Sequence, residues 1–387
     1  RYSDGIVGSD KSADRWIYIN DFTKDNAGKI REDKIANSSA RWETARKRDL
    51  GVEIGLFNSF LKLTVDIFDE KRKDMLLTPR STTFLIGNSF KNLNLGKLEK
   101  RGIEVEAEIN KTTSYLLNYH FKGMFGYNDN RIIYKDDLPY APEYKKDAGK
   151  PLGAQLNGVE VADGGYFTSV DDIHNYVSPI PLTNLNVGDY KFIDYSADGI
   201  INSNDQFPVA GNLYAPVTYS FGGGLSYKNF DFNLLFQGNA GKWVEFNQTY
   251  ELEFYKGTMR VHQSQVDYWT PVNRGANHST LHYYGTGDNP LFQWGGGEAD
   301  RGYTANLPGR FWRKADYLRL KEVYLAYTFR SEFLQKIGGM KNLTLYLTAN
   351  NLLTFTKLID GDPERKDFQQ GFYPQLKTFK LGLKASF

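Results

Sequence analysis

Apolar residues recur at every second position along much of this chain. In the last segment, residues 379–387, the odd positions are phenylalanine, leucine or alanine and the even ones lysine, glycine or serine. Side chains of a β-strand point alternately to its two faces, so this pattern predicts strands with one apolar and one polar face. The same alternation occurs at 50–56, 61–67, 103–109, 117–127, 217–227, 230–236, 323–329 and 343–349, with a weaker candidate at 15–20. We therefore expect about ten strands.

The composition excludes several other classes of protein. The chain has 387 residues, no cysteine, 48 Lys and Arg against 46 Asp and Glu, and a mean hydropathy of −0.53. Disulfide scaffolds, thiolate metal sites and thiol nucleophiles are excluded, and the balanced charge gives no reason to expect nucleic acid as a partner. No apolar run approaches the roughly 18 residues of a transmembrane helix. The alternating strands of a membrane barrel stay compatible with this hydropathy, because their two faces average out.

The connections between the expected strands alternate strictly between short and long. Some are turns of a few residues, whereas the long ones lie near 77–101, 136–213 and 246–314. A soluble sandwich carries loops at both ends without such a bias, whereas a membrane barrel has short turns on one side and long loops on the other. The pattern predicts an antiparallel transmembrane β-barrel with long extracellular loops. Neither a methionine nor a signal peptide opens the chain, so we expect a removed signal or a fragment.

In a membrane barrel the apolar face contacts outer-membrane lipid and the polar face lines the lumen. This sidedness assigns five charged residues of the expected strands to the lumen. They are Glu104, Glu106, Glu108, Lys380 and Lys384. The alternative is that they are solvated spacers without any role in ligand binding.

Several motifs, in one order along the chain, resemble SusC/RagA-type TonB-dependent outer-membrane transporters. They are Trp42–Lys47 with Leu50–Phe57, Leu63–Phe68, Tyr268–Pro271, Asp316–Lys321, Asn350–Thr356, Gly361–Glu364 and the terminal phenylalanine. The resemblance implies that residues 1–387 are about the last ten strands of a 22-stranded barrel. The plug and the N-terminal strands of that barrel are absent from this sequence. The first and last strands would then pair with the rest of the same barrel.

The resemblance also implies a function in the outer membrane of a Gram-negative bacterium. Such a protein would import oligosaccharides or peptides, with a SusD-like surface lipoprotein as a lid and TonB acting through the missing N-terminal plug segment. It would not be an enzyme. Three alternatives stay open: a siderophore or vitamin receptor, an autonomous ten-stranded outer-membrane enzyme, and a soluble carbohydrate-binding β-protein. The sequence does not choose between glycan and peptide.

The segment 194–205 has the spacing of an EF-hand-like calcium loop. Oxygen-bearing side chains occupy positions 1, 3, 5, 9 and 12, and Gly199 occupies position 6. Calcium requires six to eight hard oxygen ligands, which this spacing gathers around one tight turn. The predicted ligands are Asp194, Ser196, Asp198, Ile200, Asn202 and Asp205. The expected role is to rigidify an extracellular loop, and the alternative is an Asp/Asn/Gly turn without metal.

Aromatic and polar residues of the longest loop are candidates for contacting a ligand. Aromatic rings suit flat sugar faces or peptide side chains, and a loop-built vestibule is where a transporter first meets its ligand. The candidates are Trp269, Asn273, Arg274, Tyr283, Tyr284, Trp294 and Trp312. The alternative for each aromatic residue is packing within the loop's own small core.

Overall fold

A computed structural model gives the architecture. It describes residues 1–9, 14, 16–82, 84–113, 117–153, 156–158, 161–177, 186–199, 201, 203–246, 261–281, 312–330, 340–365, 367–368, 373 and 375–387. Within these residues no helix is long and apolar enough to cross a membrane.

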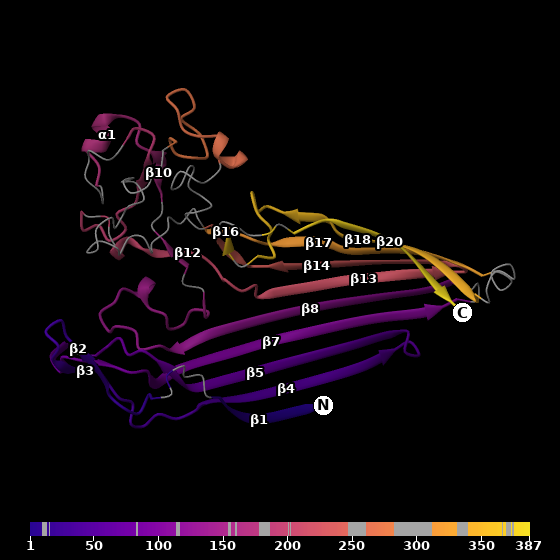
Figure 1. Ribbon diagram of the computed structural model, residues 1–387, viewed down its shortest axis with the longest axis horizontal. Coiled ribbons are helices and arrows are strands. Elements are labelled where there is room, and N and C mark those ends of the chain that lie inside the picture. The colour runs from indigo at the N-terminus through magenta and orange to yellow at the C-terminus, as the bar shows by residue number, and fades with distance from the viewer. Residues whose placement is uncertain are drawn as a thin grey trace.

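The dominant element is an antiparallel sheet of ten long strands that lie side by side along the long axis of the molecule (Figure 1). In spatial order they are β1 (Tyr2–Ser9), β4 (Glu43–Leu56), β5 (Leu61–Leu77), β7 (Leu93–Thr112), β8 (Leu117–Tyr134), β13 (Val217–Tyr227), β14 (Phe230–Ala240), β17 (Tyr317–Phe329), β18 (Asn342–Thr356) and β20 (Thr378–Ser386). Spatial order equals chain order, so every strand pairs with its sequence neighbours within this sheet. The predicted all-β antiparallel fold is confirmed.

Strand register aligns the alternating residues into rows that cross the sheet. Val52, Val65, Val105 and Phe125 are successive partners in β4, β5, β7 and β8. Many residues of this apolar face are exposed, among them Leu50, Val52, Ile54, Ile67, Phe121, Phe125, Leu225, Phe230, Leu325, Leu347, Phe379, Leu381 and Leu383. An exposed apolar surface of this extent requires an apolar partner, and lipid hydrocarbon provides one.

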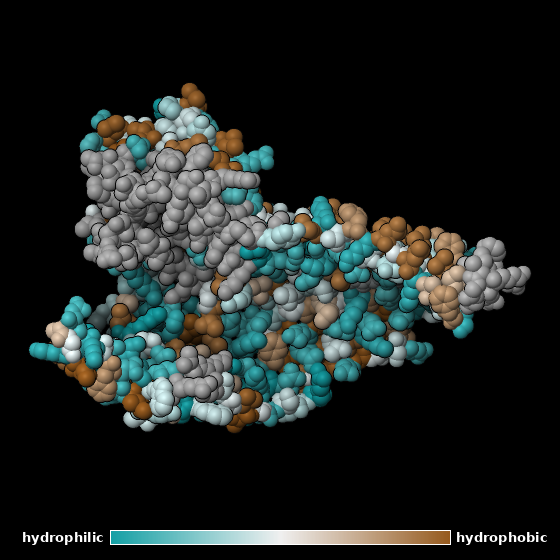
Figure 2. Space-filling model, in the orientation of Figure 1, coloured by the Kyte–Doolittle hydropathy of each residue, from teal (hydrophilic) through white to brown (hydrophobic). Residues whose placement is uncertain are grey.

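The neighbouring rows form the polar face. Asp66 of β5 lies opposite Glu104 of β7, and Thr64 lies opposite Glu106. The side of the sheet turned toward the viewer in Figure 2 is mostly hydrophilic between the loops and the turn end. The sheet is therefore amphipathic, with one face suited to lipid and the other to water.

Short turns lie at one end of the sheet and long connections at the other (Figure 1). Phe57, Asn58 and Ser59 between β4 and β5 all have positive φ, and so does Lys228 between β13 and β14. The connection expected near 77–101 is shorter than predicted, because β7 begins at Leu93 and pairs with β5 up to Leu77. The connections after β8 and β14 are long, as predicted, and they gather with the first at one end.

The weak strand candidate at 15–20 is wrong. Trp16–Tyr18 lie in a turn, and the first strand of the sheet is β1, which pairs with β4 from Tyr2 opposite Leu50 to Ser9 opposite Glu43. The other edge is β20, which pairs with β18. Within the described residues β1 and β20 are not bonded to each other, so the sheet is open. Their pairing with strands outside this sequence stays a prediction.

Short elements build the connections at the long-loop end. They are β2 (Asp21–Lys24), β3 (Ile30–Ile35) and β6 (Ser89–Phe90) in one small sheet; β10 (Val161–Tyr166) with β11 (Tyr190–Phe192); β9 (Leu156–Gly158) with β12 (Phe207–Ala210); β15 (Trp243–Phe246) with β16 (Trp312–Lys314) and β19 (Asp367–Phe368); the helix α1 (Val170–His174); and 3₁₀ turns at Phe84–Ile86, Glu143–Lys145, Ser203–Asp205 and Gln263–Val266. The clusters of buried hydrophobic residues lie mainly among these connections rather than in the large sheet.

A pair of adjacent substitutions tests which face meets lipid. Val65→Arg places a charge in the middle of the apolar face and is expected to cost about 2–4 kcal/mol of barrel stability. Thr64→Arg points to the polar face, where Asp66, Glu104 and Glu106 line the same cavity and accept a cation. Urea titration of the complete barrel protein in lipid vesicles measures both. Equal losses for the two variants would contradict the assignment of the faces.

Candidate functional site

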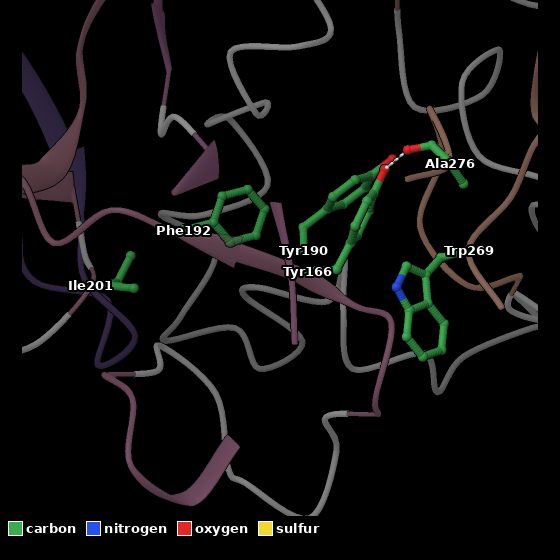
Figure 3. Packing of buried hydrophobic residues seen from close by; sticks show 6 residues of the cluster. All are labelled: Tyr166, Tyr190, Phe192, Ile201, Trp269 and Ala276. Carbon is green, nitrogen blue, oxygen red and sulfur yellow. Dashed lines mark hydrogen bonds between the residues drawn. The ribbon is translucent and has the colours of Figure 1, made fainter. Parts of the chain in front are cut away.

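An aromatic cluster joins the two longest connections. It consists of Tyr166, Tyr190, Phe192, Ile201, Trp269 and Ala276, all buried. The rings of Tyr166 and Tyr190 lie next to each other, 5.5 Å between centroids, and the Tyr166 hydroxyl donates to the Ala276 carbonyl at 2.8 Å (Figure 3). The Tyr190 hydroxyl accepts from the Ser279 amide at 3.0 Å. Tyr166, Tyr190, Phe192 and Ile201 therefore share one core with Trp269 and Ala276, although the two groups belong to different loops.

Trp269 belongs to this core rather than to a ligand surface. Its side chain is only 5% exposed, and an added Cβ on Gly188 would lie 2.3 Å from its ring. Its prediction as a ligand contact is thereby corrected: the indole fills the contact between the two loops. The sequence signal for this was present, because an aromatic residue in a long loop packs the loop's own core at least as readily as it binds a ligand.

The other ligand candidates have different positions. Asn273 is exposed and donates to the Asp267 carboxylate at 2.9 Å, and exposed Arg274 donates to the Pro271 carbonyl at 3.2 Å. Trp312 in β16 is half-buried. Both Asn273 and Arg274 shape their own turn and keep surface for a partner, and their role in ligand binding stays a prediction. Tyr283, Tyr284 and Trp294 lie outside the described residues.

The candidate calcium loop is wound as a tight turn around its first residue. Asp194 accepts from the Gly199 amide at 2.9 Å and from the Ser196 hydroxyl at 3.4 Å. Ala197 and Gly199 have positive φ, which the reversal of the chain requires. The Asp205 carboxylate is fully buried and accepts from the Ser196 amide at 2.9 Å. The carboxylates of Asp194 and Asp205, at loop positions 1 and 12, thus both contact Ser196 at position 3, as expected for oxygen ligands around one ion.

The remaining predicted ligands of this loop are either exposed or not described. Asp198 is exposed, and Ile200 and Asn202 lie outside the described residues. Among the described residues no group of three or more His, Asp or Glu side chains is arranged to hold a metal. The donor chemistry of Asp194 and Asp205 fits calcium, and the calcium assignment stays a prediction.

The lumen candidates of β7 border a cavity on the polar face. Its volume is about 500 Å³, and Glu104 and Glu106 line it together with Asp66 and Thr218. Glu106 forms an ion pair with Lys122 of β8 at 2.7 Å. Exposed ion pairs of this kind contribute little stability, so these charges stay available to another partner on this face.

The three remaining lumen candidates lie on the same face. Glu108 is the register partner of Lys62 and of Lys122. Lys380 lies opposite Thr348, and Lys384 lies opposite Thr344, so both lysines share their face with threonines of β18. By register, all five residues lie on the polar face of the sheet. Their contact with a ligand or a wet lumen stays a prediction.

A buried arginine ties the segment after β18 to the sheet. Arg319 of β17 is 2% exposed, and its guanidinium contacts Asp362 at 2.7 Å and Glu364 at 3.1 Å. Lys321 contacts Glu364 at 3.0 Å, and Lys242 donates to the carbonyl of Pro363 at 2.9 Å. Sequence reasoning missed this network, although both motifs that form it, 316–321 and 361–364, carried the family resemblance. Their charged positions were the available signal.

Several ionisable groups in the loops have shifted pKa values, among them Lys242 and Asp136. Burial lowers the pKa of Lys242, and nearby Asp362 and Glu364 act in the opposite direction. Burial acts to raise the pKa of Asp136, but hydrogen bonds from Ser81 and from the Arg80 amide outweigh it and lower that pKa. The bonds to Asp136 thus stabilise the loop at neutral pH and are lost as the pH falls through its lowered pKa.

Comparison with known proteins places this geometry among outer-membrane receptors. TonB-dependent receptor P26 of Formosa agariphila is 30% identical to the chain over 383 residues, 91% of the chain and 35% of the receptor. TonB-dependent receptor SusC of Bacteroides thetaiotaomicron is 22% identical over 409 residues, 99% of the chain and 37% of SusC. The structure of the RagAB peptide transporter matches with a TM-score of 0.69 at 20% identity, over 100% of this chain and 40% of that one.

The resemblance to SusC/RagA-type TonB-dependent transporters is confirmed. The match to RagAB also shows that the ten-stranded sheet has the fold of part of such a barrel. The chain spans about a third of the length of the curated SusC-like relatives that it matches, with 35% of P26 covered. These relatives are named as receptors rather than enzymes, in agreement with the prediction that the chain is not an enzyme. No family model matches the chain.

Removing two carboxylates tests the calcium assignment. The double substitution Asp194→Ala and Asp198→Ala is expected to abolish calcium binding to the 194–205 loop, because it deletes the ligands at positions 1 and 5. Isothermal titration of the complete barrel protein with calcium chloride measures the loss. Asp171→Ala, an exposed acid of α1, serves as the control. Unchanged calcium binding by the double variant would end the assignment.

Replacing the buried arginine tests the role of the charged network. Arg319→Met leaves Asp362 and Glu364 without their buried cation, a change that typically costs about 3–5 kcal/mol. Hydrogen exchange at the amides of Glu364 and Arg365, which bond to Asp362, is expected to accelerate at least about a hundredfold. Lys321→Met, at a more exposed position, is expected to change exchange by less than about tenfold. Similar rates in wild type and Arg319→Met would refute the network's role.

Proposed function

We propose that this chain forms part of the barrel wall, with the extracellular loops of that part, of an outer-membrane importer for oligosaccharides or peptides. The importer would work with a SusD-like surface lipoprotein and draw its energy from TonB through a plug. One observation supports this above the others: an open, amphipathic ten-stranded sheet with its long connections gathered at one end. This arrangement suits a large barrel whose wall is passive and whose loops handle the ligand.

The open edges favour a barrel wall over an autonomous barrel. An unpaired strand edge in hydrocarbon would leave each free N–H and C=O without a partner, at several kcal/mol per group. Since β1 and β20 are not paired with each other in the described residues, further strands are required to complete the sheet. The similarity to receptors about three times as long as the matched region supports the same conclusion.

The loop end supplies the surface for a ligand and for a lid. Exposed apolar side chains occur in several of these connections, including Trp16, Tyr18, Phe22, Leu85, Tyr140 and Val272, of which Tyr140 is 99% exposed. The shared core around Tyr166 and Trp269 joins the described parts of the two longest connections. A partly apolar rim with its own core is suited to holding a lipoprotein over the barrel mouth.

The named relatives favour a nutrient importer over a siderophore or vitamin receptor. SusC and the RagAB peptide transporter are among the similar proteins, and RagAB is named for peptides. Which of the two ligand classes this chain serves depends on the loops, the plug and the lid together. We infer oligosaccharides or peptides as the class and outer-membrane import as the activity.

An uptake assay with the complete transporter tests this function. Cells that express it with its neighbouring lipoprotein are given fluorescent oligosaccharides in one arm and fluorescent oligopeptides in the other. We expect accumulation of one class, dependent on TonB, because the wall itself contains no energy source. Cells without TonB are the control. Uptake that is equal with and without TonB, or no uptake of either class above the level of an empty vector, would refute the proposal.

A further inference from the structure

Rows of charged residues continue the apolar face toward the long-loop end. In the four strands β4, β5, β7 and β8, the apolar row nearest the long loops consists of Leu50, Ile67, Ile103 and Tyr127. Beyond this row the side chains on the same face are mostly charged. The next row toward the loops consists of Asp4, Arg48, Asp69, Arg101 and Asp129, which are register partners across β1 to β8. Charges of opposite sign alternate along it, three carboxylates against two cations, so this row has a charge of −1.

The rows beyond it carry an excess of positive charge. The second row consists of Arg46, Lys71, Glu99 and Arg131, and the third contains Lys73 and Lys97. Together these six residues comprise five cations and one carboxylate. The excess lies on the same side of the sheet as the apolar rows, and therefore faces the surroundings of the barrel rather than its lumen.

A groove on this side collects most of these cations. Its volume is about 430 Å³, and the outward side chains that line it include Arg46, Lys71, Lys73, Lys97 and Glu99. Arg46 is engaged by Asp4 at 2.6 Å, and Lys71 by Glu99 at 3.3 Å. Lys73 and Lys97 are exposed and have no carboxylate within 4 Å in the described part of the chain. Asp74 lies close enough to interact with both lysines, but its carboxylate is already paired with Arg41 at 2.7 Å, so the groove keeps an excess of positive charge.

The groove also lies at the right height for a lipid headgroup. Lys71 is four residues beyond Ile67 in β5, about 13 Å along a strand. For a strand tilted by about 40°, this is about 10 Å above the last apolar row, where headgroups and their sugars are found. A second groove of about 410 Å³ connects the two levels, because Leu50, Ile67, Arg48 and Lys71 all line it.

We propose that this groove, the cationic groove, binds the phosphate groups of a phosphorylated glycolipid in the outer leaflet of the membrane. The lipid's acyl chains would lie along the apolar rows, and its phosphates would contact Lys71, Lys73 and Lys97. Apolar rows, a row of mixed charge and rows with an excess of cations follow one another as acyl chains, interface and phosphates do in such a lipid. The inference rests on the proposed function, because it requires the apolar face to contact lipid.

Removing charge from the cationic groove tests the proposal. The complete barrel protein is reconstituted in phosphatidylcholine nanodiscs that contain an acylated disaccharide with two phosphates, and retention of that glycolipid is measured by native mass spectrometry. The triple substitution Lys71→Gln, Lys73→Gln and Lys97→Gln is expected to weaken retention about tenfold or more, since each lysine near an anionic lipid surface contributes to attraction. Lys71→Arg, Lys73→Arg and Lys97→Arg should retain it.

Three controls separate the proposal from simpler explanations. Lys24→Gln, Lys29→Gln and Arg31→Gln remove the same charge from the exposed β2–β3 hairpin and should leave retention unchanged. The same glycolipid after phosphatase treatment should not distinguish the groove variant from wild type. Inorganic phosphate at equal concentration should not displace the lipid, because it lacks contacts with the apolar rows.

The possible outcomes are distinct. Equal retention by the groove variant and wild type would overturn the proposal, and so would displacement by inorganic phosphate, which would indicate a site for free anions. A protein that fails to enter the nanodiscs at all would refute the proposed membrane function instead. If the protein enters the nanodiscs and retains phosphatidylcholine, but retains the glycolipid equally with and without its phosphates, only the proposal for the cationic groove is refuted.

Discussion

The structure depends on satisfying every backbone N–H and C=O along the strands without water. In hydrocarbon each unpaired group costs several kcal/mol, so the strands must bond to both neighbours across the full apolar band. The unbroken order from β1 to β20 meets this demand except at its two edges. That constraint also fixes side-chain position, because a register slip of one residue would exchange the apolar and polar faces of a strand. Rows such as Val52, Val65 and Val105 show the register held across three strands.

The sequence predicts the sheet well where residues alternate and poorly where they do not. Period-two rows identify nine of the ten strands, because lipid on one side and polar surroundings on the other impose opposite demands on neighbouring residues. The exception is β1, where Tyr2 and Ile6 share their parity with Asp4 and Gly8 and no face is consistently apolar. Its place in the sheet is decided by backbone bonds to β4, which leave no trace in side-chain pattern.

The core shared by the two long loops could not be predicted from alternation in the sequence, because its contacts are long-range. Tyr166 bonds to Ala276, which is 110 residues away, and Trp269 packs against Gly188. Contacts of this range follow from how two loops fold against each other, and no local period encodes them. The charged network around Arg319 is predictable from the sequence in part. Arg319 and Asp362 are each conspicuous in their motifs, but only the fold brings β17 and the segment after β18 together and makes the pair a buried one.

Averages over the chain conceal the separation of charge that the fold creates. A net charge of +2 and a mean hydropathy of −0.53 describe an unremarkable polar protein. In space, carboxylates such as Glu104 and Glu106 collect on the polar face, whereas Lys71 and Lys97 collect above the apolar rows on the other face. Each strand produces this by assigning its odd and even positions to different surroundings, and register then adds the contributions of neighbouring strands. The same two-residue period that places leucine on the apolar face therefore also determines which charges lie on the polar face and which lie beyond the apolar rows.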